Sequence, residues 1–325
     1  MPDFRDYRLT LRLLSPLGTP MHSDTLFGHL CWQMLFREGE EGLKSFLEPF
    51  AEGEPAFLVS DAFPAGLLPK PLFPFSARSI GNTPEEYARR KKRRKAPFLR
   101  EADFLAVLRG EEPKGEPVGN VWRTVSVPHA AISRATFTTG AREDEAGALY
   151  FTEAKVLSLP ADEAGGGERN RLLQIYIRDL SDSVSLVESL FRALSLTGFG
   201  RDKSTGAGAF ELLSVEEYPN FAPPPDSDAF VSLSWYVPAA GDPTEGFWKA
   251  QVKRGFLGEM NAPDSPGNPN PFKRPFVRFE PGSFFRTGGV PKPFYGRMLK
   301  GIAPGFADAV QYGYAFPAAC RAPAE

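Results

Sequence analysis

Residues 196–210 form a glycine-rich stretch with the residue types best suited to binding a phosphate. Glycine lets the backbone adopt positive φ angles and approach a ligand closely. Free backbone N–H groups with arginine and lysine beside them suit a phosphate oxygen. The stretch therefore predicts a phosphate or nucleic-acid contact, and its candidate residues are Gly200, Arg201, Lys203, Ser204, Thr205, Gly206 and Gly208.

Two common nucleotide-binding motifs do not fit this stretch. A P-loop requires glycine before the lysine, where Asp202 stands, and a Rossmann fingerprint requires a third glycine at the position of Lys203. An apolar helical pattern precedes the stretch and a strand-like pattern follows it. A plain connection between a helix and a strand therefore stays open as the alternative.

The number and spacing of the histidines argue against catalysis. The chain has three histidines and contains no HD pair and no HxxxH, patterns that would supply metal ligands or an acid and a base near a scissile phosphate. Metal-independent cleavage by His22 or His129 with Lys203 remains an alternative. His22 and Ser23 open a predicted helix, where they either contact a phosphate or base, or only cap the helix.

The positive charge is concentrated in one segment. Residues 78–100 contain nine basic and two acidic residues, whereas the whole chain has a net charge of -2. Residues 89–95 are all basic, so this segment is expected to be exposed and mobile. Such a run is often only a solvated surface, but in an otherwise acidic chain it favours a polyanionic partner. Its candidate RNA-binding residues are Arg78, Arg90, Lys91 and Lys92.

Length and composition set broad limits. A chain of 325 residues suggests about two domains. Its two cysteines, Cys31 and Cys320, form no CxxC pair, which fits a reducing cytoplasm and argues against a structural zinc site. No membrane span, signal peptide, metal site or cofactor motif is expected.

The predicted elements follow an alternating order. Strands are expected at residues 7–13, 148–157, 172–177 and 210–215, and helices after His22 and after Ser183. Residues 55–76 are expected to be an irregular loop anchored by aromatic side chains, and residues 97–108 a short apolar helix. With a basic insertion at about 60–145, this is the order of a ferredoxin-like, split βαβ unit.

A proline-rich linker at residues 223–225 separates a second, smaller unit. In this unit strands are expected at 230–237 and 311–316, a strand, a turn and a second strand within 276–285, and a helix at 245–256. The predicted fold class is therefore α+β, with two ferredoxin-like (RRM-like) domains at 1–220 and 226–325 and a glycine-rich loop at 198–208.

Several patches resemble one family. These are G-x-G-x-x-x-S-T-G-x-G from Gly198, H-S-D-T-L-F-G from His22, H-x-x-I-S-R-x-T from His129, R-F-E-P-G-S-F-F from Arg278, and the late Y-G-Y-A-F. Together they resemble the RAMP superfamily of CRISPR-associated RNA-binding proteins. They are most similar to the subunit that holds the guide-RNA 5′ handle in type III-A (Csm) effector complexes.

The resemblance implies a function in antiviral defence. It implies a cytoplasmic, non-catalytic subunit that binds the crRNA 5′ handle, caps the backbone filament and meets target RNA only indirectly. It also implies contacts with the large polymerase-bearing subunit and the backbone RAMP subunit. Arg134 joins the candidate RNA-binding residues, with an ion pair to residues 143–145 as the alternative. A RAMP endoribonuclease that processes repeat RNA and a purely structural assembly subunit remain open.

Overall fold

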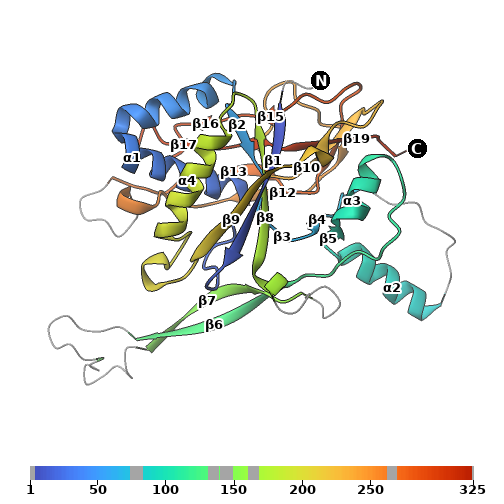
Figure 1. Cartoon of the computed structure of the whole chain (residues 1–325), viewed down its shortest axis with the longest axis horizontal. Helices are drawn as coiled ribbons and strands as arrows, with labels where there is room; N and C mark the ends of the chain where they lie inside the picture. Colours follow the sequence, from blue (N-terminus) through green and yellow to red (C-terminus); the bar gives the residue numbers. More distant parts are fainter. Residues whose placement is uncertain are drawn as a thin grey trace.

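The computed structural model describes residues 4–73, 83–130, 139, 149–159, 168–261 and 269–323, without the side chains of residues 89, 90 and 168. Helices and strands are mixed along the chain, as an α+β fold requires (Figure 1). The predicted residues Arg78 and Arg134, and the side chain of Arg90, lie outside the described part. No helix in the described ranges combines the length and apolar character needed to cross a bilayer.

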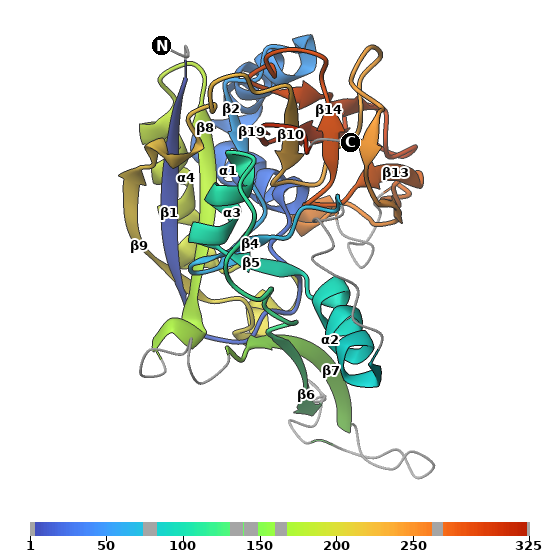
Figure 2. The same ribbon diagram turned by 90° about the vertical axis from the view of Figure 1, so that its right-hand side faces the viewer.

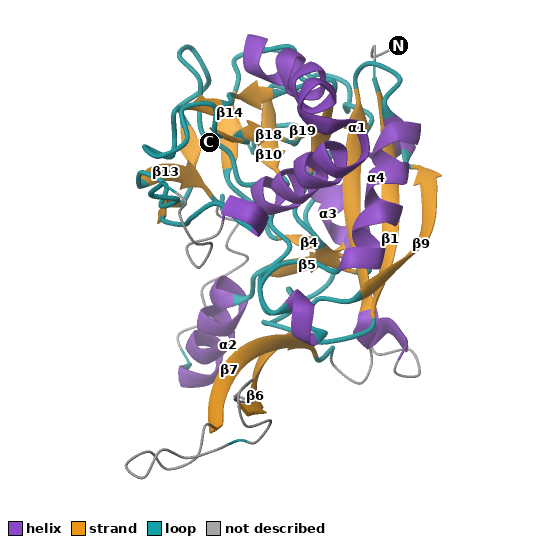
Figure 3. Cartoon of the chain, turned by 90° about the vertical axis from the view of Figure 1, so that its left-hand side faces the viewer, coloured by secondary structure: helices purple, strands orange, loops and turns teal. Residues whose placement is uncertain are grey.

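The main sheet has the strand order β2-β8-β1-β9, and all its neighbours are antiparallel. Helices α1 and α4 pack together on one of its faces (Figure 3). This is the arrangement of a split βαβ unit, as the sequence predicted. The bounds are β1 Arg5–Leu13, α1 Ser23–Glu52, β2 Phe57–Val59, β3 Phe63–Pro64 (which pairs with β8), β8 Leu172–Asp179, α4 Val184–Thr197 and β9 Phe210–Glu217.

One strand of this sheet differs from the prediction. The strand expected at 148–157 exists as β7 (Leu149–Leu157), but it pairs only with β6 (Trp122–Ala130). Its expected place in the main sheet is taken by β2, which lies in the segment predicted to be an irregular loop. The residues of β2 are all buried, so the run is apolar throughout and lacks the alternation that identifies a half-exposed strand.

The insertion contains the hairpin β6–β7, which projects from the body of the molecule (Figure 2). It also contains β4 (Leu67–Pro69), α2 (Pro84–Lys95), β5 (Phe98–Arg100) and α3 (Glu101–Leu108). The apolar helix expected at 97–108 is therefore wrong in its first part, where residues 98–100 pair with β4. Helix α3 lies over the face of the main sheet opposite to α1 and α4 (Figure 2).

Helix α2 contains the basic run. Its first turn has a complete capping box between Thr83 and Glu86, and its acidic residues precede its basic ones. Both features favour a helix, because the macrodipole prefers negative charge at the N-terminus and positive charge at the C-terminus. Residues 91–95 are exposed, as expected, but this ordered helix replaces the mobile segment of the prediction.

The C-terminal part is built on a second antiparallel sheet, β11-β14-β10-β19. The helix predicted at 245–256 is wrong, because these residues form β11 and β12. Gly246 has a φ of 150°, and a Cβ there would lie 2.1 Å from the carbonyl oxygen of Phe284 on β14. The strand at 230–237 is shorter than expected, and the one at 311–316 is split. The strands are β10 Ala229–Ser232, β11 Gly246–Phe247, β12 Ala250–Lys253, β13 Phe276–Phe279, β14 Phe284–Arg286, β15 Tyr295–Gly296, β16 Leu299–Lys300, β17 Val310–Gln311, β18 Tyr314–Ala315 and β19 Pro317–Cys320.

The two parts of the chain share one hydrophobic core. Leu9 and Ile175 of the main sheet belong to the same buried cluster as Val231, Phe284 and Ala318 of the second sheet. The described residues after 226 contain no α-helix. The second ferredoxin-like unit and the boundary near residue 223 therefore stay predictions.

Candidate nucleic-acid interface

The glycine-rich loop is closed by its own backbone. The N–H of Phe199 donates to the carbonyl of Gly208 at 3.0 Å, and the N–H of Gly208 donates to the carbonyl of Pro16 at 2.8 Å. Gly208 has a φ of 67°, and a Cβ there would lie 1.9 Å from the oxygen of Phe199. Its role is therefore structural, because only glycine allows the two arms of the loop to approach this closely.

His29 supports the same loop from α1. Its ring lies 4.6 Å from the buried ring of Phe199, and its Nε2 accepts the backbone N–H of Gly200 at 3.2 Å. Burial lowers the pKa of His29 to about 4, so the imidazole is neutral at physiological pH and can accept this hydrogen bond. No local sequence pattern indicates this contact between residues 171 positions apart.

Arg201 joins the loop to its two neighbours. Its backbone N–H donates to Thr19 Oγ1 at 3.0 Å, and its Nη2 donates to the carbonyl of Glu153 in β7 at 2.7 Å. The side chain is 54% exposed and also pairs with Asp202 at 3.1 Å. The guanidinium therefore lies at the junction of the loop, the β1–α1 turn and the hairpin, with surface free for a phosphate.

The other predicted loop residues divide into two groups. Lys203 forms an ion pair with Glu259 and is 22% exposed, so its charge is already neutralised. Ser204, Thr205 and Gly206 are exposed on the outer edge of the loop. Within the described residues, the backbone N–H groups of Asp202, Lys203 and Ser204 make no hydrogen bond, whereas the other N–H groups of residues 198–208 donate to acceptors in the loop or in its neighbouring elements.

His22 and Ser23 are more buried than residues that contact a ligand on the surface. Ser23 is fully buried, and its backbone N–H donates to Asp61 Oδ1 at 2.8 Å. The ring of His22 lies 5.4 Å from that of Trp235. Burial lowers the pKa of His22 to about 4, which leaves it uncharged and unsuited to attracting a phosphate. Neither side chain caps α1, so the simple capping alternative is wrong.

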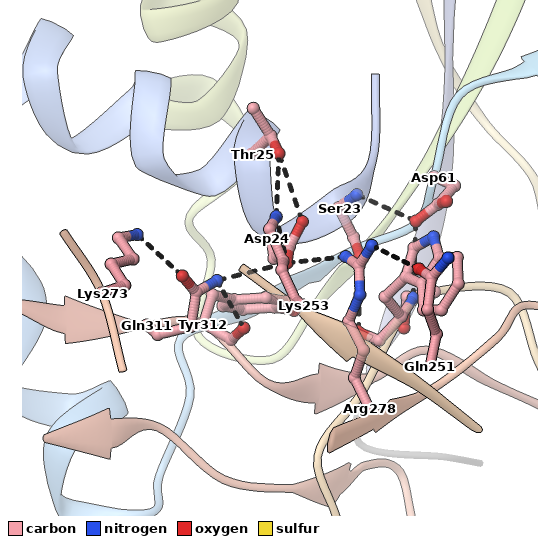
Figure 4. Close-up of polar contacts among 12 residues, drawn as sticks. Ser23, Asp24, Thr25, Asp61, Gln251, Lys253, Lys273, Arg278, Gln311 and Tyr312 are labelled. Atoms are coloured by element: carbon pink, nitrogen blue, oxygen red, sulfur yellow. Dashed lines mark hydrogen bonds and ion pairs between the residues drawn. The ribbon is translucent and has the colours of Figure 1, made fainter. Parts of the chain in front are cut away.

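A buried polar network joins the start of α1 to the strands β12, β13 and β17 of the C-terminal part (Figure 4). Asp24 Oδ2 accepts from Lys253 Nζ at 2.7 Å, Arg278 Nη1 at 2.9 Å and Gln311 Nε2 at 3.3 Å. Burial alone would raise the pKa of Asp24, but the charges of Lys253 and Arg278 hold it below its usual range. Lys273 Nζ donates to Gln311 Oε1, and burial lowers the pKa of Lys273 to about 8.

The hairpin and α2 extend this surface. Tyr150 and Phe151 on β7 are 49% and 67% exposed, so their rings are available for stacking against bases. Lys91 and Lys92 are exposed on α2, whose last carbonyls accept hydrogen bonds from Lys70 Nζ. The hairpin and α2 both lie at the lower end of the molecule in Figures 1 and 2.

No cluster of His, Cys, Asp and Glu that could bind a metal occurs in the part of the chain that the structure describes. His129 lies on β6, stacked on Tyr150 with ring centroids 5.1 Å apart, and it hydrogen-bonds Thr152 at 2.9 Å. His22 and His29, with pKa values near 4, are weak bases at neutral pH.

Comparisons with known proteins find similarity at the level of fold. No family model matches the chain, and no curated protein matches it. A crystal structure of a Csm1-Csm4 cassette in complex with cA4 matches with a TM-score of 0.60 and 20% identity, covering 98% of this chain and 100% of that chain. A crystal structure of the cassette in complex with AMPPNP matches with a TM-score of 0.56 and 20% identity, covering 98% of this chain and 99% of that chain.

A second kind of assembly matches as well. The Csm3-Csm4 subcomplex of the type III-A CRISPR-Cas interference complex matches with a TM-score of 0.51 and 15% identity, over 94% of this chain and 98% of that chain. The likeness to these structures is therefore one of fold. Csm4 is the component common to these assemblies, and the chain has a Csm4-like fold over nearly its whole length.

Proposed function

We propose that this chain is the non-catalytic subunit of a type III-A CRISPR effector complex that binds the 5′ handle of the guide RNA. The observation that carries the proposal is the half-exposed Arg201, fixed between the glycine-rich loop, the β1–α1 turn and the β6–β7 hairpin of a Csm4-like fold. A fixed guanidinium, unpaired loop N–H groups and exposed aromatic rings are the elements that single-stranded RNA binding requires.

The same proposal assigns its partners. The similar structures are assemblies with Csm1 and with Csm3. We infer that this chain docks the large polymerase-bearing subunit on one side and the backbone RAMP subunit on the other, and so caps the filament. Target RNA would be reached only through the guide. Both cysteines are free, which fits a place in the cytoplasm, in antiviral defence.

The proposal is tested by binding of a labelled repeat-derived handle RNA to the purified chain across a salt series. Arg201→Ala is expected to weaken binding about tenfold, because it removes a charge-assisted hydrogen bond. Arg192→Ala is the matched control, since Arg192 on α4 is 56% exposed and pairs with Glu188 on the same helix.

The RNA is also checked for cleavage on a gel. Intact RNA and a selective loss in Arg201→Ala support the proposal. Cleavage without added metal would identify the chain as a processing endoribonuclease instead. Equal binding by both variants and the wild type would contradict a role of the loop in RNA recognition and favour a purely structural subunit.

A further inference from the structure

A cavity of about 340 Å³ lies directly behind the Arg201 junction. The β1–α1 turn and β7 form part of its wall through Leu17 and Lys155, which pair with each other as an isolated bridge. Two residues before Lys155 is Glu153, whose carbonyl holds Arg201. The cavity therefore continues inward from the proposed RNA surface. Its volume falls at the lower end of the range of about 300–1,000 Å³ for small-ligand sites.

The walls of this cavity are mainly aromatic and apolar. Trp122, Trp235, Phe63 and Phe98 all contribute to the lining. Trp235 is held rigidly, because the guanidinium of Arg278 lies 3.7 Å from the centroid of its ring. The buried Asp24 network that anchors Arg278 thus also supports this wall. Rigid aromatic walls are suited to a planar ring that stacks against them.

Two polar side chains, those of Asp61 and His22, line this apolar surrounding. Asp61 is 5% exposed, and its Oδ1 accepts the backbone N–H groups of Ser23 at 2.8 Å and Trp235 at 3.4 Å. Both of these bonds go to Oδ1, so the carboxylate keeps the capacity to accept a further donor at Oδ2. Burying a carboxylate is costly unless it is well hydrogen-bonded, so a donor from a ligand is favoured there.

We propose that this cavity binds one unstacked nucleobase of the bound RNA, whose exocyclic amino group donates to Asp61 Oδ2. The inference rests on the proposed function for the source of the base. Adenine, cytosine and guanine carry such an amino group, whereas uracil presents only carbonyl oxygens at the equivalent positions. A carboxylate accepting from cytosine N4 is an established form of base recognition. Burial raises the pKa of Asp61 to about 7, so the carboxylate is the main form at pH 8.

The test compares cytosine with uracil at pH 8, because these bases have the same size and differ at this group. The probes are CMP and UMP, followed by tryptophan fluorescence, and eight-nucleotide oligo(C) and oligo(U), followed by anisotropy. The wild type is expected to bind the cytosine probes about tenfold more tightly. Asp61→Asn keeps an oxygen for Ser23 and Trp235 and presents an amide donor instead, so the preference is expected to reverse toward uracil.

Two further variants sharpen the test. Ala62→Phe fills the cavity from its wall and is expected to abolish both nucleotide binding and base preference. Asp226→Asn makes the same chemical change at an exposed carboxylate and is expected to behave as the wild type. Thermal unfolding of each variant confirms that it is folded.

The outcomes separate this inference from the proposed function. Handle RNA bound without a preference between cytosine and uracil would overturn the cavity inference alone. Selective binding of CMP without binding of handle RNA would keep the nucleobase site and overturn the proposed function. Equal binding of both bases, with assembly onto partner subunits lost in Ala62→Phe, would overturn the inference and identify the cavity as a site for a partner's side chain.

Discussion

Three buried ionisable residues near the first half of α1 control how the stability of the fold responds to pH. Burial lowers the pKa of His22 and of His29 to about 4, so the unfolded chain, with pKa values near 6.5, binds more protons between these limits. Each histidine therefore contributes stability that is fully present above pH 6.5 and is lost as the pH falls toward 4. The pKa of Asp61 is raised to about 7, so the folded chain binds more protons than the unfolded chain between about pH 4 and 7. Asp61 therefore contributes stability as the pH falls through this range, opposite to the histidines.

Together these three groups set how steeply the free energy of unfolding changes with pH, which can be measured. Each group changes the free energy of unfolding by up to about 1.4 kcal/mol per pH unit. The two histidines lower this free energy as the pH falls and the aspartate raises it. The free energy of unfolding is therefore expected to fall by about 1.4 kcal/mol per pH unit between pH 6.5 and 4.5. His22→Phe keeps a ring beside Trp235 and is expected to flatten the slope. Asp61→Asn is expected to steepen it. Urea unfolding at a series of pH values checks both, and an unchanged slope in His22→Phe would show that His22 titrates normally.

The sequence identified the loop residues by type but not their contacts. The glycine pattern correctly indicated positive φ at Gly206 and Gly208. It also suggested free N–H groups throughout the loop, whereas most of them donate to acceptors in the loop itself, in α1, in α4 or in the β1–α1 turn. The ion pair of Lys203 joins residues 56 positions apart, and no local pattern encodes such a partner.

Helix α2 carries the charge that should set the salt dependence of RNA binding. Each neutralised phosphate releases counterions, so the logarithm of the affinity for single-stranded RNA falls with the logarithm of salt concentration by about 0.7 per contact. Lys91→Gln with Lys92→Gln is expected to reduce this slope by about 1.4 for the handle RNA. The control pair is Lys292→Gln with Lys300→Gln, two exposed lysines outside the insertion. Equal slopes in both pairs would show that α2 does not contact the RNA.

At the level of elements, the sequence predicted those with a clear period or cap. The strand β1, the helices α1 and α4, and the strand β9 were found because one face of each is buried. The strand β8 was found as well, although every residue after Leu172 is buried. The prediction failed for β2, which is buried on all sides, and at 245–256, where pairing of Gly246 with β14 overrides a helical pattern. Strand β7 was found but assigned to the wrong sheet, since pairing partners depend on topology rather than on local residues.

At the scale of the whole molecule, the two parts of the chain are joined by apolar and by charged contacts. The main core contains side chains from both sheets, and Asp24 on α1 binds Lys253 and Arg278 beside the second sheet. The sequence suggested a linker at 223–225 and could not reveal these contacts, which connect positions more than 200 residues apart. Contacts of this kind make the folding of one part depend on the other.

The chain is therefore expected to unfold in a single cooperative transition. In calorimetry the measured and van't Hoff enthalpies should agree, which is the usual test of two-state behaviour. Asp24→Ala leaves Lys253 and Arg278 buried without their counterion, so it should destabilise the whole chain by about 3–5 kcal/mol and move the transition without splitting it. Asp226→Ala, at an exposed ion pair, should shift it by less than about 1 kcal/mol. Two resolved transitions, of which Asp24→Ala moves only one, would contradict a shared core and favour independent domains on either side of residues 223–225.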